Sequence, residues 1–248
     1  GEDNDGDGIG DTPYNIPPQG LDPEPLVKPL PAKGMPVPTL KPAAYEATVG
    51  VHLSINNNTI WEDQFVEFTG RFVVEEGASL TLRNVTLATN PYKISAAENW
   101  LTVRSGAALY IYESRILGAE RNSSAAIKAE RGSIVVVKDS LIRNLYTGES
   151  ALDIGTDGAI IENNVFERNF AAISVMGSSH CRIVNNTISE SYISIDIAGE
   201  NNTVANNKVS KTVRYGIRGG SHVVGNIVSD VWGDAVFCFG NSLIENNT

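Results

Sequence analysis

The segments IENNVF (161–166), VNNTI (184–188), ANNKV (205–209), VGNIV (224–228) and IENNT (244–248) are variants of one short motif, and they decide the fold of this chain. Their last asparagines are Asn164, Asn186, Asn207, Asn226 and Asn247, so the motif recurs after 22, 21, 19 and 21 residues. A period of this length is one short supersecondary unit per turn of a repeat protein.

A looser form of the same unit occurs upstream, in GASLTLRNVTL (77–87), GAALYIYESRIL (106–117) and GSIVVVKDSLI (132–142). Apolar residues alternate with other residues before a polar turn, which is the period of a β-strand. Leucine-rich repeats need a leucine framework that these segments lack, and helical repeats need roughly 33 residues or more per unit. The sequence therefore predicts an all-β parallel β-helix with two or three short strands per coil and about eight coils.

The paired asparagines have a physical role in such a fold. Asparagine tolerates the left-handed backbone of a tight turn, and its amide can bond to an asparagine stacked in the next coil. We interpret the Asn-Asn pairs as turn residues rather than as ligands.

The composition limits the class of protein. The chain has 248 residues, of which 42% are hydrophobic and 19% charged, and this is an ordinary soluble composition. The formal net charge of −10 argues against a nucleic-acid partner. No apolar stretch approaches a transmembrane span, and there is no signal peptide, so we expect a mature or excised chain.

The N-terminal part differs in composition from the repeats. Ten of the eleven prolines lie between Pro13 and Pro42, which favours extended polyproline backbone over helix or sheet. This segment is either a semi-rigid linker or a strap along the following domain, and the sequence leaves both open. We predict three parts: an acidic loop at 1–14, a Pro-rich linker or strap at 15–48, and the β-helix at 49–248.

The first residues match an acidic calcium loop. Carboxylates occupy its positions 1, 3, 5 and 9, a glycine occupies position 6, and a backbone carbonyl is available at position 7; the corresponding ligands are Asp3, Asp5, Asp7, Asp11 and Ile9. Position 12, which normally holds a bidentate glutamate, is Tyr14, so Asp22, Glu24 or water would complete the shell. We expect a structural calcium ion here; a solvated acidic turn is the alternative.

Stacking the coils also aligns one outward column: Lys128, Asp153, Ser174, Asp196, Arg218 and Phe237. Asp153 and Asp196 would lie two coils apart, about 9.6 Å, near the upper limit for the two carboxylates of an inverting glycosidase. Arg218 would lie one coil further on. The simpler interpretation is a ladder of solvated or salt-bridged side chains on a sheet face.

Histidines and cysteines add little chemistry. His180 and His222 are expected in similar turns about 10 Å apart, too far to share a metal ion. Cys181 and Cys238 are predicted three coils apart, beyond the reach of a disulfide, so we expect two free and mostly buried thiols. Of six N-x-S/T sequons, Asn57 and Asn122 have loop-like contexts and are the predicted glycosylation sites; those in the turn ladder are expected to be too packed.

The repeats IENNVF, VNNTI and ANNKV, preceded by GASLTLRNVTL, resemble those of the NosD-like family, also called carbohydrate-binding and sugar-hydrolysis (CASH) domains. The segment from Asp5 to Tyr14 resembles the tail that closes a repeat domain in large archaeal cell-surface proteins. The resemblance covers about 200 residues of solenoid and the first 14 residues. It implies a right-handed, single-stranded parallel β-helix with an extended N-terminal leader. The clustered catalytic motifs of pectin-type enzymes and His- or Met-rich copper ligands are absent from the sequence.

These observations lead to one expected function and one alternative. We expect a non-enzymatic extracellular module that is structural or contacts glycans in a cell-surface layer, sheath or fibre. Its partners would be a surface polysaccharide or neighbouring subunits stacked end to end, because the chain stops within a repeat and is expected to continue in a larger polypeptide or polymer. The alternative is a polysaccharide hydrolase or lyase that uses Asp153, Asp196 and Arg218.

Overall fold

A computed structural model of the chain describes residues 14–16, 20–22, 52–68, 70–89, 101–118, 126–145, 150–219, 222–239 and 242–248. The chain divides into two compact units, Gly1–Lys41 and Pro42–Thr248. In the first unit, β1 (Tyr14–Ile16) and β2 (Gly20–Asp22) form an antiparallel pair. Part of the segment predicted to be polyproline is thus a hairpin, and its two strands contain no proline, which would remove a ladder hydrogen bond.

The second unit consists of three parallel sheets. Sheet I contains β3 (His52–Ile55), β6 (Arg71–Val74), β9 (Leu101–Val103), β12 (Ile127–Ala129), β15 (Ser150–Ile154), β18 (Ala171–Met176), β21 (Ile193–Ala198), β24 (Tyr215–Gly219) and β27 (Asp234–Phe237). Sheet II contains β4 (Thr59–Glu62), β7 (Ser79–Arg83), β10 (Ala108–Tyr112), β13 (Ile134–Lys138), β16 (Ile160–Glu162), β19 (Arg182–Val184), β22 (Thr203–Ala205), β25 (His222–Val224) and β28 (Leu243–Glu245). Sheet III contains β5 (Phe65–Phe68), β8 (Thr86–Thr89), β11 (Arg115–Leu117), β14 (Leu141–Arg143), β17 (Val165–Glu167), β20 (Thr187–Ser189), β23 (Lys208–Thr212) and β26 (Ile227–Val231).

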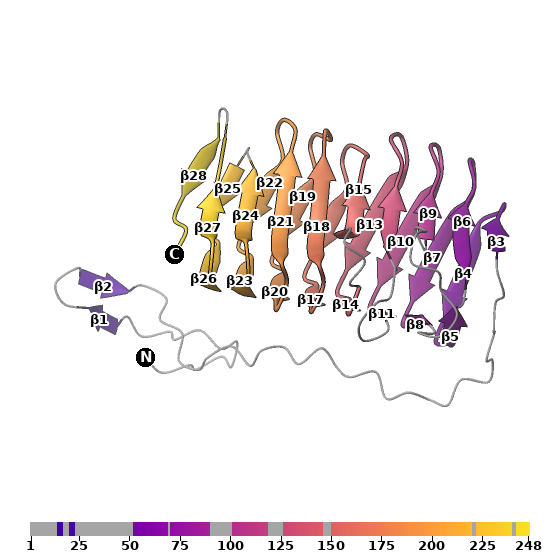
Figure 1. The fold of residues 1–248 in the computed structure, drawn as a ribbon, viewed down its shortest axis with the longest axis horizontal. Helices are drawn as coiled ribbons and strands as arrows, with labels where there is room; N and C mark the ends of the chain where they lie inside the picture. The colour runs from indigo at the N-terminus through magenta and orange to yellow at the C-terminus, as the bar shows by residue number, and fades with distance from the viewer. Residues whose placement is uncertain are drawn as a thin grey trace. The chain divides into compact units, whose positions relative to one another are not determined.

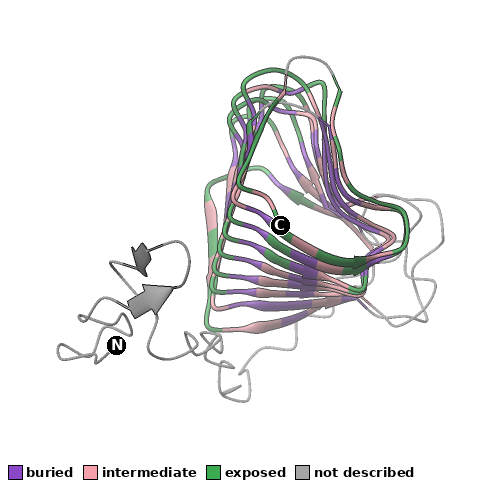
Figure 2. Cartoon of the chain, turned by 90° about the vertical axis from the view of Figure 1, so that its left-hand side faces the viewer, coloured by how far each residue is buried: buried purple, intermediate pink, exposed green. Residues whose placement is uncertain are grey.

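Each coil contributes one strand to each sheet, in the order I, II, III, and every strand pairs with the equivalent strand one coil away (Figure 1). The view along the axis shows the three sheets as walls around a buried interior (Figure 2). The second unit is therefore a β-solenoid of about eight turns, as the repeat period predicts. The described part of the chain contains no helix long and apolar enough to span a membrane.

The interior is filled by stacked columns of branched and aromatic side chains. On sheet I, for example, Leu152, Ile173, Ile195 and Ile217 follow one another in register, and each is fully buried. Phe72 and Phe166 are the largest fully buried side chains. Because alternate residues of each strand point outward, the outer faces of the walls are the surfaces on which function can reside.

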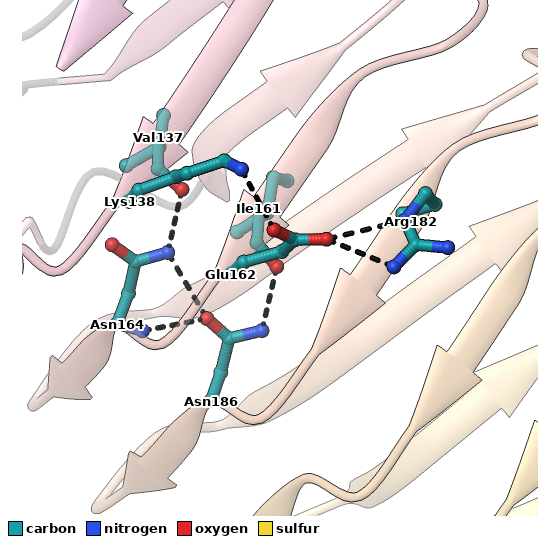
Figure 3. Close-up of polar contacts among 7 residues, drawn as sticks. All are labelled: Val137, Lys138, Ile161, Glu162, Asn164, Arg182 and Asn186. Carbon is teal, nitrogen blue, oxygen red and sulfur yellow. Dashed lines mark hydrogen bonds and ion pairs between the residues drawn. The ribbon is translucent and has the colours of Figure 1, made fainter. Parts of the chain in front are cut away.

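The motif asparagines form a continuous ladder at the turn between sheets II and III. The backbone N–H of Asn164 donates to Oδ1 of Asn186 at 2.9 Å, and its Nδ2 donates to the same oxygen at 3.0 Å and to the carbonyl of Val137 at 2.9 Å (Figure 3). The same contacts link Asn186 to Asn207, Asn207 to Asn226, and Asn226 to Asn247. Ser140 and Ser114 continue the ladder towards the N-terminus with their hydroxyls.

The two asparagines of each pair have different roles. The second one is buried in the ladder, whereas the first one has a positive φ, as at Asn163 (58°), Asn185 (57°) and Asn206 (55°). Asparagine accepts this left-handed conformation at lower cost than most residues. The predicted turn chemistry is confirmed, and the structure divides it between the two members of the pair.

Candidate functional site

The outward column on sheet I has the register that the sequence predicts. Lys128 pairs with Asp153, Asp153 with Ser174, Ser174 with Asp196, Asp196 with Arg218, and Arg218 with Phe237. These six residues, which we call the sheet I column, lie on β12, β15, β18, β21, β24 and β27. They project from six successive coils because the coils keep their register here.

Asp196 and Arg218 form a two-point ion pair. Nε of Arg218 donates to Oδ1 of Asp196 at 2.8 Å, and Nη2 donates to Oδ2. Asp196 is only 9% exposed, so the pair is partly shielded from water and the hydrogen bond with Asp196 raises the pKa of Arg218. Planar two-point pairing of this kind is the strong form of the arginine–carboxylate interaction.

Aromatic side chains surround the C-terminal end of the column. The guanidinium carbon of Arg218 lies 5.2 Å from the ring centre of Tyr215, and that of Arg214 lies 4.9 Å from it. The Tyr215 ring is 6.1 Å from the Phe237 ring, and Phe239 is 6.4 Å beyond Phe237. Phe237 and Phe239 are about half exposed, at 47% and 50%. Exposed rings beside polar side chains are the combination that recognises amphipathic ligands.

The N-terminal half of the column is polar and less engaged. Among the described residues, the carboxylate of Asp153 has no hydrogen-bond or ion-pair partner, although Lys128 and Ser174 are its neighbours in register. Ser174 is 7% exposed. Lys128 and Asp153, which are partly exposed, are therefore the polar groups of this half that a ligand can engage without breaking an ion pair.

The geometry changes the acid–base interpretation of Asp153 and Asp196. The two residues are separated by the one intervening strand β18, as predicted, which corresponds to about 9.6 Å. However, both oxygens of Asp196 are bound by Arg218, so neither is free to transfer a proton. The observed arrangement favours a salt-bridged ladder over a pair of catalytic carboxylates.

A second ion-pair network lies on the outer face of sheet II. Nζ of Lys138 is 2.9 Å from one oxygen of Glu162, and Nη2 of Arg182 is 3.1 Å from the other (Figure 3). The hydrogen bond with Lys138 is the main cause that lowers the pKa of Glu162. The side chain of Glu162 is 17% exposed, so the network is partly shielded.

The predictions for histidine and cysteine are only partly met. His180 is a turn residue with φ of 60°, whereas His222 is not a turn residue but the first residue of β25, in register with Thr203. Both cysteines are free: Cys181 is fully buried, Cys238 is partly buried, and burial raises the pKa of both thiols.

The predicted calcium ligands Asp3, Asp5, Asp7, Ile9 and Asp11 lie outside the described residues. Within the described ranges, no group of three or more His, Cys, Asp or Glu side chains is arranged to hold a metal ion. Of the glycosylation candidates, Asn57 is exposed in the turn between β3 and β4, and Asn122 lies outside the described residues. The packing argument against the ladder sequons is wrong for Asn185, which is the exposed, left-handed residue before the buried ladder residue Asn186. Asn201 is exposed and left-handed too, and it precedes the buried Asn202 in the turn between sheets I and II.

Sequence reasoning placed Phe237 in the column but missed the other aromatic residues of the site, Tyr215 and Phe239. Tyr215 lies in register with Ile193 and Ala171, and no repeat motif marks that position. Arg214 belongs to the preceding turn. The only available signal was the local sequence VRYGIR (213–218), in which two arginines flank a tyrosine.

Comparisons with known proteins agree on the fold. The family model described as "Right handed beta helix region" matches residues 125–248, which is half of the chain. Two crystal structures of the periplasmic alginate epimerase AlgG, one of them of a mutant, are similar with TM-scores of 0.57 and 0.52. Each is 13% identical, and the match covers 78% of this chain and 55% of the epimerase. This chain thus spans about half the length of those structures. No curated protein sequence matches.

Proposed function

Because the chain belongs to the right-handed β-helix family, we propose that it is a non-enzymatic extracellular module that contacts a polysaccharide through the outer face of sheet I. Its repeats would be of the NosD-like (CASH) type, and it would serve in a cell-surface layer, sheath or fibre of the archaeal kind. In this proposal a calcium ion bound by Asp3, Asp5, Asp7, Ile9 and Asp11 stiffens the N-terminal leader.

The sheet I column is the observation that carries this proposal. Polar groups at Lys128, Asp153 and Ser174 continue in register into the Asp196–Arg218 pair and then into exposed aromatic rings. Sugars present hydroxyl groups at their edges and C–H groups on their faces, so a sugar chain can use both kinds of surface at once. The column runs along the solenoid axis across six strands, which suits an extended polymer better than a small ligand.

The direct test is binding to a panel of neutral and acidic polysaccharides, including alginate, by affinity gel electrophoresis with calcium present. We expect retardation by at least one polymer and about tenfold weaker binding for Tyr215→Ala, since one aromatic contact is worth about 1 kcal/mol or slightly more. Phe65→Ala, which removes a partly exposed ring from sheet III, is the matched control and should bind as the unmodified protein does. Equal loss in both variants, or no binding to any polymer, would contradict the proposal.

Hydrolysis or lysis of a polysaccharide is the second candidate, and Asp153 is the observation in its favour. Its carboxylate is the acidic group of the column that no described residue binds. The assay is release of reducing ends and unsaturated products from the same panel, with Asp153→Asn as the variant. Turnover that disappears in Asp153→Asn would replace the non-enzymatic proposal, whereas binding without turnover would exclude the second candidate on these substrates.

A further inference from the structure

The outer face of sheet II carries an apolar patch between β4 and β16. Ile60 is 63% exposed and Ile134 is 53% exposed. Tyr110 on β10 lies between them in the sheet, Val136 lies on the same strand as Ile134, and Ile160 lies on the next strand, β16. All three are partly exposed, and the Tyr110 ring stacks on Tyr112 with centroids 6.4 Å apart. Parallel sheets are normally covered on both faces, and a contiguous apolar surface marks a contact site.

Charged residues border this patch in a fixed order. Along one register position of the sheet, the successive residues are Glu62, Arg83, Tyr112, Lys138 and Glu162. Beyond them, Arg182 on β19 is half exposed and bound to Glu162. The neighbouring register position is occupied by Ile60, Thr81, Tyr110, Val136 and Ile160, which are apolar except for Thr81, and it becomes charged at Arg182.

This order is self-complementary about a two-fold axis that runs parallel to the strands and between β10 and β13. Such an axis reverses the order of the coils and keeps the position along each strand. Arg83 of one copy then lies over Glu162 of the other, Tyr112 lies over Lys138, and Glu62 approaches Arg182. Thr81 lies over Ile160, and Tyr110 lies over Val136. Opposite charges meet opposite charges, a cation meets an aromatic ring, and Tyr110 covers Val136, whereas Ile60 at the edge of the patch lies over Arg182.

Other placements of a second copy fit less well. An axis through β10 itself would put Glu62 over Glu162 and Arg83 over Lys138, which places like charges together. An axis that runs along the solenoid midway between the two register positions would put the charged position over the apolar one and leave the charges unpaired. The charge pattern therefore disfavours these two placements.

We propose that the outer face of sheet II is the interface of a side-by-side dimer, in which a second copy of this chain runs antiparallel about an axis between β10 and β13. The two sheets would face each other about 10 Å apart, the usual separation of packed sheets. This dimer is independent of the glycan proposal, because sheet I stays accessible on both copies.

Sedimentation velocity of the full 248-residue chain over a range of concentrations tests the dimer. We expect a species of twice 26.6 kDa. Ile134→Lys should weaken association at least tenfold, because it buries a charge opposite Ala108. Ile227→Lys, which changes a 52% exposed isoleucine on sheet III, should dimerise normally. A monomer at every concentration, or equal loss in both variants, would overturn the proposal.

The register has its own test. Arg83→Glu places two glutamates together, so its dimer should be weaker at low salt and should recover as salt screens the repulsion. In a Cys238→Ser background, a thiol cross-linker that spans about 10 Å should join a mixture of Thr81→Cys and Ile160→Cys proteins into mixed dimers. Either protein alone should give little product. Equal cross-linking of single and mixed samples would overturn the proposed axis.

Discussion

At the residue scale, the buried ladder asparagines are the positions at which a small change should have the largest effect. Asn186 accepts from the N–H and Nδ2 of Asn164 and donates to Ile161 and Asn207, all within the protein. Asn186→Ala leaves several of these buried groups without partners, and each unsatisfied group costs about 1–3 kcal/mol. We expect a loss of about 3 kcal/mol in the free energy of unfolding, measured by urea denaturation.

The neighbouring Asn185 provides the matched control. It is exposed and has φ of 57°, a conformation that glycine adopts freely. Asn185→Gly should change the free energy of unfolding by less than about 1 kcal/mol. Similar losses in the two variants would show that the ladder bonds do not contribute as the structure implies.

The two thiols give a second test at this scale. Cys181 is fully buried, with Sγ 3.4 Å from the carbonyl of Thr156, whereas Cys238 is partly exposed. Burial raises the pKa of both, so the reactive thiolate is scarce at neutral pH. Mass spectrometry after iodoacetamide treatment of the folded protein should find Cys238 modified before Cys181. Modification of both thiols in the same molecule should require denaturation. Faster modification of Cys181 would contradict its position in the core.

At the scale of elements, the Lys138–Glu162–Arg182 network links three strands of sheet II, and its contribution to the free energy of unfolding depends on pH. The pKa of Glu162 is lowered below its ordinary value of 4.5, mainly by the hydrogen bond with Lys138. The resulting stability is present above pH 4.5 and is lost as pH falls through the lowered pKa. Glu162→Gln should therefore lower the free energy of unfolding by about 1 kcal/mol at neutral pH, and the difference should shrink in acid.

Glu113→Gln is the control for the pH experiment. Glu113 is exposed in a turn and has no ion-pair partner among the described residues. Its variant should follow the pH profile of the unmodified protein, measured by chemical denaturation at successive pH values. A Glu162→Gln difference that persists unchanged in acid would mean that the network acts through packing and not through charge.

Element register was predictable where a local sequence pattern marks the strand, and not where the position was inferred from the average coil length. The sheet I column from Lys128 to Phe237 was predicted correctly, although its coils differ in length, because apolar residues on both sides of each member mark the strand. His222 was misplaced because the coil between Asn207 and Asn226 has only 19 residues. Its turn is shortened at Gly219, where φ is 121° and a Cβ would collide with the carbonyl of Ile197. The apolar patch on sheet II was missed because outward isoleucines read as ordinary members of alternating strands.

At the scale of the whole molecule, the solenoid predicts that coils are exchangeable units. Residues 165–186 form one complete period of 22 residues, from the start of β17 to the ladder asparagine Asn186. Removing them joins Asn164 to Thr187 and restores the ladder, all three strand registers and the inward columns, because each coil contacts only its neighbours. We expect this variant to fold cooperatively with strand-type circular dichroism.

A deletion of residues 176–186 is the matched comparison. It removes half a period, so the strand that enters sheet III would follow directly from sheet I, and inward side chains would lose their alignment. This shorter deletion should unfold the protein or bind hydrophobic dyes, although it removes fewer residues. If the shorter deletion were the more stable of the two, register between coils would not be the main source of stability. The result also bears on function, because the full-period deletion places Asp153 next to Asp196 and removes Ser174 from the sheet I column.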